Sequence, residues 1–257
     1  MMLVLNYPHF RPSFEPRRLR APEIWALGEA ARRQIVGAAQ KPKLDLSRLI
    51  ARSRRLQVNG LAFEAHWELG RAITDDAGNP ALGVVEHDES WPSAALISLN
   101  GALIEEREDL ARSTAGHELG HAVFETPAWI QRSRQPSLRL ELNEPAPERR
   151  FQPLATGAVP VKAVPGVPDW REWRANEFMG ALLAPRPLLH RHMFKRAAAL
   201  GIPMVAPERG HELPLLAGRR AGFEAIETLA IDLAEIFGVS IDFIQVRLRK
   251  YGLISGR

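Results

Sequence analysis

Two histidines and a glutamate interrupt an otherwise apolar stretch of the chain, and they restrict its conformation more than any other feature. His117, Glu118 and His121 lie among small and apolar residues that run from 110 to 123. Residues four apart share one face of a helix, so both imidazoles can reach one ion there. Burying these polar groups would cost free energy unless they found partners, and a divalent cation is such a partner. The segment therefore predicts a helix, ending near Phe124, that carries a metal site.

Hydrophobic periodicity divides the rest of the chain into helices and short strands. Apolar residues recur at helical spacing in five segments, which are 22–39, 44–56, a stretch from Asp169 to just before Pro185, 221–237 and 241–251. Short apolar or alternating runs separated by turn residues predict a small sheet of about three strands, at 61–65, 82–87 and 95–100. The expected fold class is α+β, with a small twisted sheet packed against the histidine-bearing helix and with N-terminal and C-terminal helices.

A proline-rich segment follows the histidine-bearing helix. Eight prolines lie between Glu125 and Pro168, and they exclude a continuous helix or a central strand across this segment. We therefore predict a long loop over 125–168, inside a core that spans 61–187. Residues 1–60 are expected to form a lead and helices that pack on the core. Residues 188–257 are expected to form a C-terminal helical segment with a helix pair like a helix-turn-helix, continuous with the core.

Composition limits the chemistry that is available. The chain has no cysteine, which excludes disulfides and thiolate metal sites and leaves histidine and carboxylate as strong ligands. The net charge of +4 is read as an arginine-rich solvated surface.

No stretch has the features of a secretory signal or the length of a membrane span. The expected location is cytoplasmic, with no membrane partner.

A catalytic zinc site usually has three protein ligands and a water, so a third ligand is needed. Glu172 is the first candidate, and Asn176, four residues later, is placed to hydrogen-bond a ligating histidine. Alternatively, Asp169 and Glu172 form a capping box, in which Glu172 would only satisfy a backbone amide. Spacing does not decide between the two roles for Glu172. The other candidates for the third ligand are Glu177, His190, His192 and His211.

These residues resemble a known family. The segment 113–121, preceded by 97–100, resembles the active-site region of the ImmA/IrrE metallopeptidase family. Residues 172–178 and 182–185 resemble its second signature, E-x-x-A-N-x-F followed by L-L-x-P, and 233–254 is similar to its C-terminal helical segment. The resemblance thus covers residues 60 to 254. It implies a gluzincin-like core in which His117, His121 and Glu172 hold zinc.

The expected function is zinc-dependent peptide hydrolysis, with manganese as an alternative metal. Glu118 would take a proton from the attacking water and pass it to the leaving amine. The resemblance further implies a protein partner, a helix-turn-helix transcriptional repressor cleaved in a stress-response or mobile-element circuit. Substrate backbone is expected to add to an edge of the sheet, with 96–99 as the candidate strand.

Two alternatives remain open. One is a DNA-binding regulator that uses 223–237, the turn 238–240 and the helix with Arg247, Arg249 and Lys250 as a helix-turn-helix. Direct DNA binding is not favoured, because the family resemblance accounts for the same residues without DNA. The other is a regulator that binds a repressor through a structural or sensory zinc site without proteolysis, and the presence of Glu118 argues against it.

Overall fold

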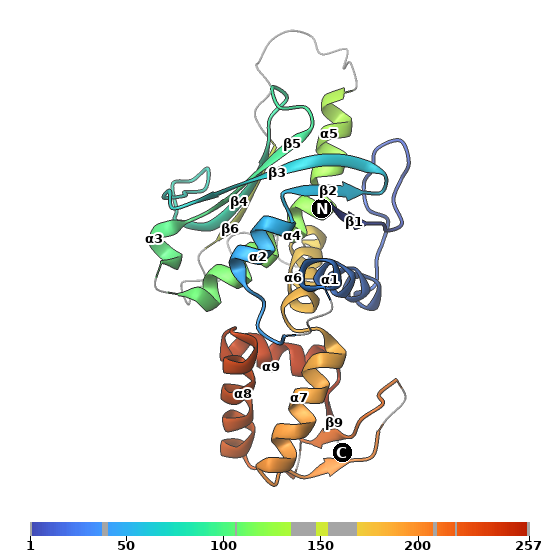
Figure 1. The fold of residues 1–257 in the computed structure, drawn as a ribbon, viewed down its shortest axis with the longest axis vertical. Helices are drawn as coiled ribbons and strands as arrows, with labels where there is room; N and C mark the ends of the chain where they lie inside the picture. The colour runs from blue at the N-terminus through green and yellow to red at the C-terminus, as the bar shows by residue number, and fades with distance from the viewer. Residues whose placement is uncertain are drawn as a thin grey trace.

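A mixed sheet, with helices packed against it, forms one part of the molecule, and a smaller helical part adjoins it (Figure 1). The computed structural model describes residues 2–37, 41–105, 107–134, 148–153, 169–207, 210–218 and 220–255. The predicted α+β class is confirmed. One hydrophobic cluster includes side chains from both parts, such as Leu119 and Leu233.

Within the described residues, the main sheet has six strands, in the order β1-β2-β3-β5-β4-β6. They are β1 (Leu3–Leu5), β2 (Arg55–Val58), β3 (Leu61–Leu69), β4 (Ala81–His87), β5 (Ala94–Leu99) and β6 (Glu148–Pro153). The pairs β1–β2 and β3–β5 are parallel, and the other pairs are antiparallel. Asn59 and Gly60 both have positive φ between β2 and β3, which is the geometry of a tight two-residue hairpin turn.

The helices of the main part include α1 (Ala21–Val36), α2 (Leu46–Arg52), α3 (Gly101–Ile104), α4 (Glu108–Phe124), α5 (Thr126–Arg134) and α6 (Trp170–Leu183). Helix α4 lies against strands β4 and β5 and is packed on its other side by α6, which in turn contacts α1. All but the first turn of α4 is largely buried. The histidine-bearing segment is thus a helix ending at Phe124, as predicted.

The C-terminal part consists of α7 (Arg186–Ala199), α8 (Phe223–Phe237) and α9 (Ile241–Lys250) with a small sheet of β7 (Met204–Val205), β8 (Leu215–Ala217) and β9 (Ile254–Ser255). Gly238 ends α8 in the left-handed conformation, and the Ser240 hydroxyl accepts from the Phe243 amide at the start of α9, so the predicted helices 221–237 and 241–251 are each capped at the turn between them.

Some expectations were wrong. The predicted helix 44–56 ends at Arg52, and its last residues enter strand β2, so the first 60 residues supply two strands of a sheet larger than expected. Segment 125–168 is not a loop throughout, because it contains α5 and β6. Pro127 is tolerated in the first turn of α5, where its missing amide has no helical partner, and β6 is the last strand in the sheet order. Residues 135–147 and 154–168 of the predicted loop lie outside the described residues.

The predicted substrate edge at 96–99 was also wrong. These residues belong to β5, which is hydrogen-bonded to β3 on one side and to β4 on the other. A strand paired on both sides cannot accept an added peptide backbone. Among the described strands, the one at the end of the sheet order beyond β4 is β6.

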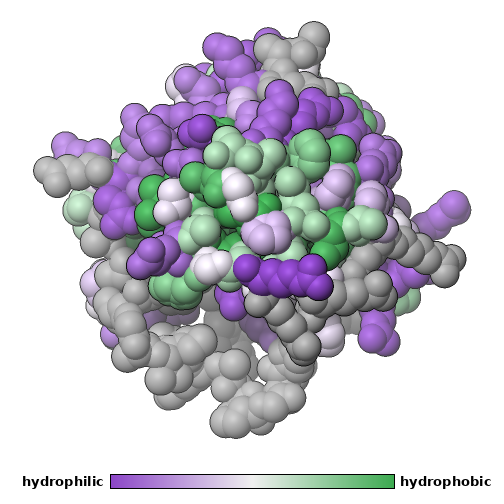
Figure 2. Space-filling view, turned by 90° about the horizontal axis from the view of Figure 1, so that it is seen from below, coloured by the Kyte–Doolittle hydropathy of each residue, from purple (hydrophilic) through white to green (hydrophobic). Residues whose placement is uncertain are grey.

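The surface of the C-terminal part includes an apolar area. Figure 2 looks onto the end formed by the C-terminal part and shows an apolar area there, bordered by hydrophilic residues. The exposed hydrophobic residues of this part include Leu200, which follows α7, and Phe223, which begins α8 and is 81% exposed. In the described ranges, no helix is both long enough and apolar enough to cross a lipid bilayer.

Candidate metal centre

The close approach of α4 and α6 creates the site. A Cβ atom at Gly120 would lie 2.9 Å from Ala175 Cα, and one at Gly116 would lie 3.3 Å from Met179 Cγ. Only glycine therefore lets the two helices come this near at position 120. The consequence is that the first turn of α6 lies over the face of α4 that carries the two histidines.

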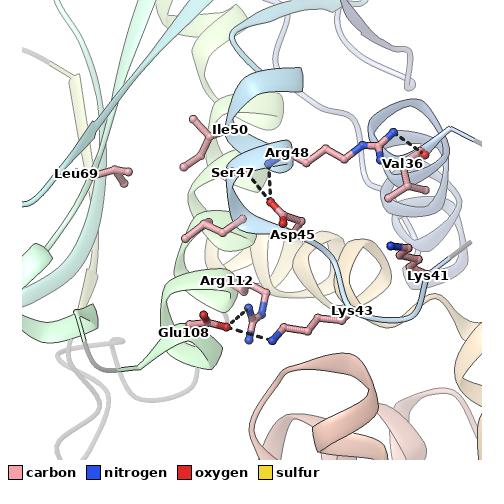
Figure 3. A pocket seen from close by; sticks show the side chains of 11 residues that line it. Val36, Lys41, Lys43, Asp45, Ser47, Arg48, Ile50, Leu69, Glu108 and Arg112 are labelled. Atoms are coloured by element: carbon pink, nitrogen blue, oxygen red, sulfur yellow. Dashed lines mark hydrogen bonds and ion pairs between the residues drawn. The ribbon is translucent and has the colours of Figure 1, made fainter. Parts of the chain in front are cut away.

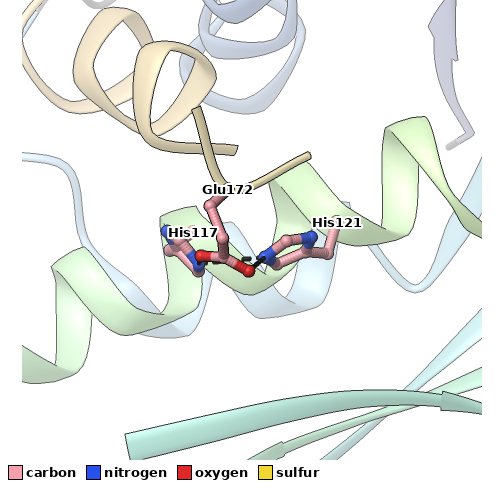
Figure 4. A group of neighbouring side chains, drawn as sticks. All are labelled: His117, His121 and Glu172. Carbon is pink, nitrogen blue, oxygen red and sulfur yellow. Dashed lines mark hydrogen bonds and ion pairs between the residues drawn. The ribbon is translucent and has the colours of Figure 1, made fainter. Parts of the chain in front are cut away.

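Three side chains converge at this crossing. Glu172 extends from α6 toward the imidazoles of His117 and His121 on α4 (Figure 4). The two Nε2 atoms are 3.0 Å apart, and Glu172 places Oε2 3.3 Å from His117 Nε2 and Oε1 3.2 Å from His121 Nε2. Donor atoms bound to one tetrahedral zinc ion lie about 3.3 Å apart. The three predicted ligands are thus brought together with spacings that suit such an ion.

The hydrogen bonding of these groups also suits a cation. Within the described part of the chain, His117 Nδ1, His121 Nδ1 and both carboxylate oxygens of Glu118 are buried without a hydrogen-bond partner. The nitrogens that face each other are the Nε2 atoms, and together with the Glu172 carboxylate they present lone pairs to one point, which a divalent cation would satisfy. The donor set of two nitrogens and one oxygen fits zinc and, with less preference, manganese.

Glu118 lies beside the ligands without joining them, on the side of α4 that faces the sheet. It is fully buried, and a Cβ atom at Gly83 of β4 would come within 2.7 Å of its Oε1. The backbone of β4 therefore passes directly over the Glu118 carboxylate. Sequence reasoning did not single out Gly83, although a glycine inside a predicted strand is a known sign of close backbone approach.

The two alternative roles of Glu172 are separated by the structure. The Asp169 side chain caps α6 by accepting from the amides of Arg171 and Glu172, while the Glu172 carboxylate points to the histidines. Burial lowers the pKa of His117, and a contact with the Asn176 side chain is the weakest of the influences that oppose this, but Asn176 does not supply the missing partner of Nδ1. The predicted role of Asn176, a hydrogen bond that orients a ligating histidine, therefore stays a prediction.

The other candidates for the third ligand have different partners. Glu177 accepts from Trp25, Arg247 and Lys250, and His190 Nε2 bonds the Pro214 carbonyl. His192 packs on Phe237, and His211 lies beside Arg186. Among the described residues, the one group able to hold a metal ion is His117, His121 and Glu172.

Burial and mutual contact set the protonation of the group. Burial lowers the pKa of His117, despite the opposing effect of Glu172, so its imidazole is neutral and its lone pair is available. Burial would raise the pKa of Glu172, but the hydrogen bonds and charges of the two histidines outweigh it and hold that pKa well below its usual range. Burial, and then the charge of Glu172, raise the pKa of Glu118 well above normal. Of the two carboxylates, Glu118 is thus more basic than Glu172.

A cavity of about 760 Å³ lies apart from the three candidate ligands, beside α2 and the first turns of α4 (Figure 3). Its charged groups are largely occupied with structural contacts. Arg48 binds the carbonyls of Ile35 and Val36, and Glu108 pairs with both Lys43 and Arg112. Few charged groups of this cavity are therefore left to bind a ligand.

Comparisons of the chain with protein-family models, with curated protein sequences and with solved structures found no match. The function of the centre is therefore inferred from the arrangement of its own residues.

Proposed function

We propose that the protein is a zinc-dependent endopeptidase whose metal is held by His117, His121 and Glu172. The observation that carries the proposal is the position of Glu118, a buried carboxylate of raised pKa that adjoins the three ligands and has no hydrogen-bond partner among the described residues. A purely structural metal site would not need such a group. The same arrangement supports membership in the ImmA/IrrE family, which the sequence motifs indicate.

Different residues of the chain would carry out different steps of peptide hydrolysis. A divalent cation bound by the three ligands would acidify water and polarise a peptide carbonyl. With that cation bound, the Glu118 carboxylate would accept the proton of the attacking water and later return it to the leaving amine. Gly83 keeps the space that this carboxylate occupies.

A helix-turn-helix repressor remains the proposed protein substrate, on the strength of the family resemblance. Direct DNA binding by α9 is less favoured than hydrolysis, because two of its three basic residues serve another purpose. Arg247 and Lys250 both pair with Glu177 of α6, and Arg247 is buried. Phosphate contacts need accessible cations that are not already paired, and on this helix Arg247 is buried while the exposed Lys250 is paired with Glu177.

The substitution Glu118→Gln tests the proposal, because it removes the base and keeps the ligands. The zinc-loaded variant should retain about one metal ion per chain by atomic emission but lose at least about 10²-fold in cleavage of repressors encoded beside the gene. Product is measured by mass spectrometry, with His117→Ala as the control that loses metal as well. An unchanged rate in the metal-loaded E118Q protein would refute the assigned base.

A further inference from the structure

An arginine cluster lies one helical turn beyond His121. The carboxylate of Glu125, which is 4% exposed, faces Arg150 of β6 and Arg171 and Arg174 of α6. The Glu125 amide bonds the His121 carbonyl, and Arg171 and Arg174 flank Glu172 in the sequence. The cluster thus adjoins two of the three proposed metal ligands.

This cluster holds more positive charge than its internal carboxylate neutralises. Arg174 Nη2 donates to Glu125 Oε1 at 3.3 Å, while the Nε atoms of Arg171 and Arg150 lie 3.5 and 3.7 Å from Oε2, beyond good hydrogen-bond length. The Nε atoms of Arg150 and Arg174 are buried and have no hydrogen-bond partner in the described ranges. Buried donors of this kind are costly to leave unpaired, so they favour a further acceptor.

Two adjoining cavities open onto the cluster. One, of about 220 Å³, is lined by Glu125, Arg171 and Arg174, and a second, of about 410 Å³, contains Arg17 and Arg18. Pro16, Trp170 and Arg174 form walls of both cavities.

The aromatic wall strengthens the case for a ligand. The Trp170 ring is 52% exposed and meets the Trp173 ring edge to face at 5.6 Å, beside the arginines. Arg132, which also lines the smaller cavity, pairs with Glu15 and Glu148, so it adds no surplus charge. Exposed tryptophan next to under-neutralised arginine is the composition of binding hot spots.

We propose that these two cavities bind an acidic segment of the polypeptide substrate beside the scissile bond, so that the arginine cluster selects the substrate. Carboxylate side chains would complete the hydrogen bonding of Arg171 and Arg174, because a guanidinium binds a carboxylate through two parallel bonds. The tryptophans would cover the apolar side chains between them. A peptide is favoured over a nucleic acid because the cluster adjoins the metal centre, and this inference rests on the proposed peptidase function.

The test measures binding without requiring cleavage. A fluorescein-labelled octapeptide of alternating glutamate and alanine is titrated by anisotropy into the zinc-loaded Glu118→Gln protein, beside the same peptide with glutamine in place of glutamate. We expect the glutamate peptide to bind at least about tenfold more tightly and to weaken as salt is added. Equal affinity for the two peptides would overturn the proposal.

Variants in the same E118Q background locate the binding surface. Arg171→Gln should weaken binding by about twofold to fivefold, as expected for an exposed charge contact. The matched control is Arg196→Gln on α7, because Arg196 is 47% exposed and pairs with Asp232 at 3.4 Å, while Arg171 is 45% exposed and pairs with Glu125 at 3.5 Å. Equal weakening by both variants would place the peptide elsewhere and overturn the proposal.

Glu125→Gln gives a prediction of opposite sign. Removing the internal carboxylate frees the arginines, so the glutamate peptide should bind more tightly, whereas a general loss of structure would weaken binding. Arg174→Lys keeps the charge but loses the two parallel bonds, and it should weaken binding while the protein stays folded.

Two further measurements separate this inference from the proposed function. A labelled single-stranded oligonucleotide that bound through Arg171 more tightly than the peptide would overturn the proposal in favour of a nucleic-acid ligand. Digestion of a peptide library by the wild-type protein should enrich aspartate and glutamate near the cleavage site. Cleavage without this enrichment would refute the acidic selectivity and leave the peptidase function intact. Binding of the glutamate peptide without cleavage of any peptide would refute the peptidase function alone.

Discussion

At the scale of single residues, the candidate centre depends on the close passage of the β4 backbone at Gly83 beside the Glu118 side chain. Gly83 of β4 leaves room for the Glu118 carboxylate, which is buried beside the three proposed ligands. Any larger residue at position 83 would push this carboxylate out of place. The reactivity of the centre is therefore expected to be more sensitive than its metal affinity to a change at Gly83.

The substitution Gly83→Ala tests this dependence. Its Cβ would lie 2.7 Å from Glu118 Oε1, so the carboxylate must move. A displacement of this size is expected to lower the cleavage rate by about 10²-fold, while zinc stoichiometry stays unchanged. Gly222→Ala is the control, because a Cβ there meets no atom within 4 Å. Equal rates for G83A and G222A would contradict the steric argument.

The raised pKa of Glu118 predicts a pH effect on the metal-free protein. Above the ordinary carboxyl pKa of 4.5, the folded state keeps a proton that the unfolded chain has lost, so this group lowers stability as pH rises. Glu118→Gln cannot ionise and lacks this loss. Relative to the wild type, the unfolding free energy of the variant should rise by up to about 1.4 kcal/mol per pH unit from pH 4.5 until the pH reaches the raised pKa of Glu118. Denaturant unfolding at several pH values measures it, and a pH-independent difference would argue against the raised pKa.

At the scale of elements, α4 and α6 must pack closely for the third proposed ligand to reach the histidines. Gly120 touches the backbone of Ala175, whereas Gly116 faces the flexible side chain of Met179. The two glycines therefore differ in what a methyl group would displace. The distance between the helices is set at Gly120, and so is the position of Glu172.

Alanine at each glycine separates these effects. Gly120→Ala forces the helices apart and should cost about 1–3 kcal/mol of unfolding free energy, together with a loss of zinc affinity as Glu172 moves away. Gly116→Ala meets a side chain at 3.3 Å that can shift, so both effects should be smaller. Chelator competition and thermal melting measure them. The packing argument fails if G116A weakens zinc binding as much as G120A.

At the scale of the whole molecule, one buried carboxylate joins α6, the helix that carries Glu172, to the C-terminal part. Glu177 of α6 is 1% exposed and binds Arg247 and Lys250 of α9 as well as Trp25 of α1. The opposing charges of Glu177 and Arg247 are both buried, so removing Glu177 would leave the Arg247 guanidinium buried without its carboxylate partner.

Glu177→Ala should therefore lower the unfolding free energy by about 3–5 kcal/mol, because it leaves Arg247 buried and uncompensated. Asp232→Ala is the matched control. It removes the partner of Arg196, which is 47% exposed, and such a pair is worth about 0–1 kcal/mol. Urea unfolding compares the two variants. Similar losses would show that the Glu177 contact does not anchor the C-terminal part.

The sequence by itself determined the α+β class, the histidine-bearing helix, the start of a helix near Asp169 and the turn 238–240 between the last two helices. These are local features, because a cap or a helical face depends on residues within a few positions of each other. The tertiary structure alone decided that Glu172 faces the histidines instead of closing a capping box. It also decided that Gly83 lies over Glu118 and that Arg150 of β6 meets Glu125. Each of these contacts joins residues that are distant in the chain, and only the packing of sheet and helices brings them together.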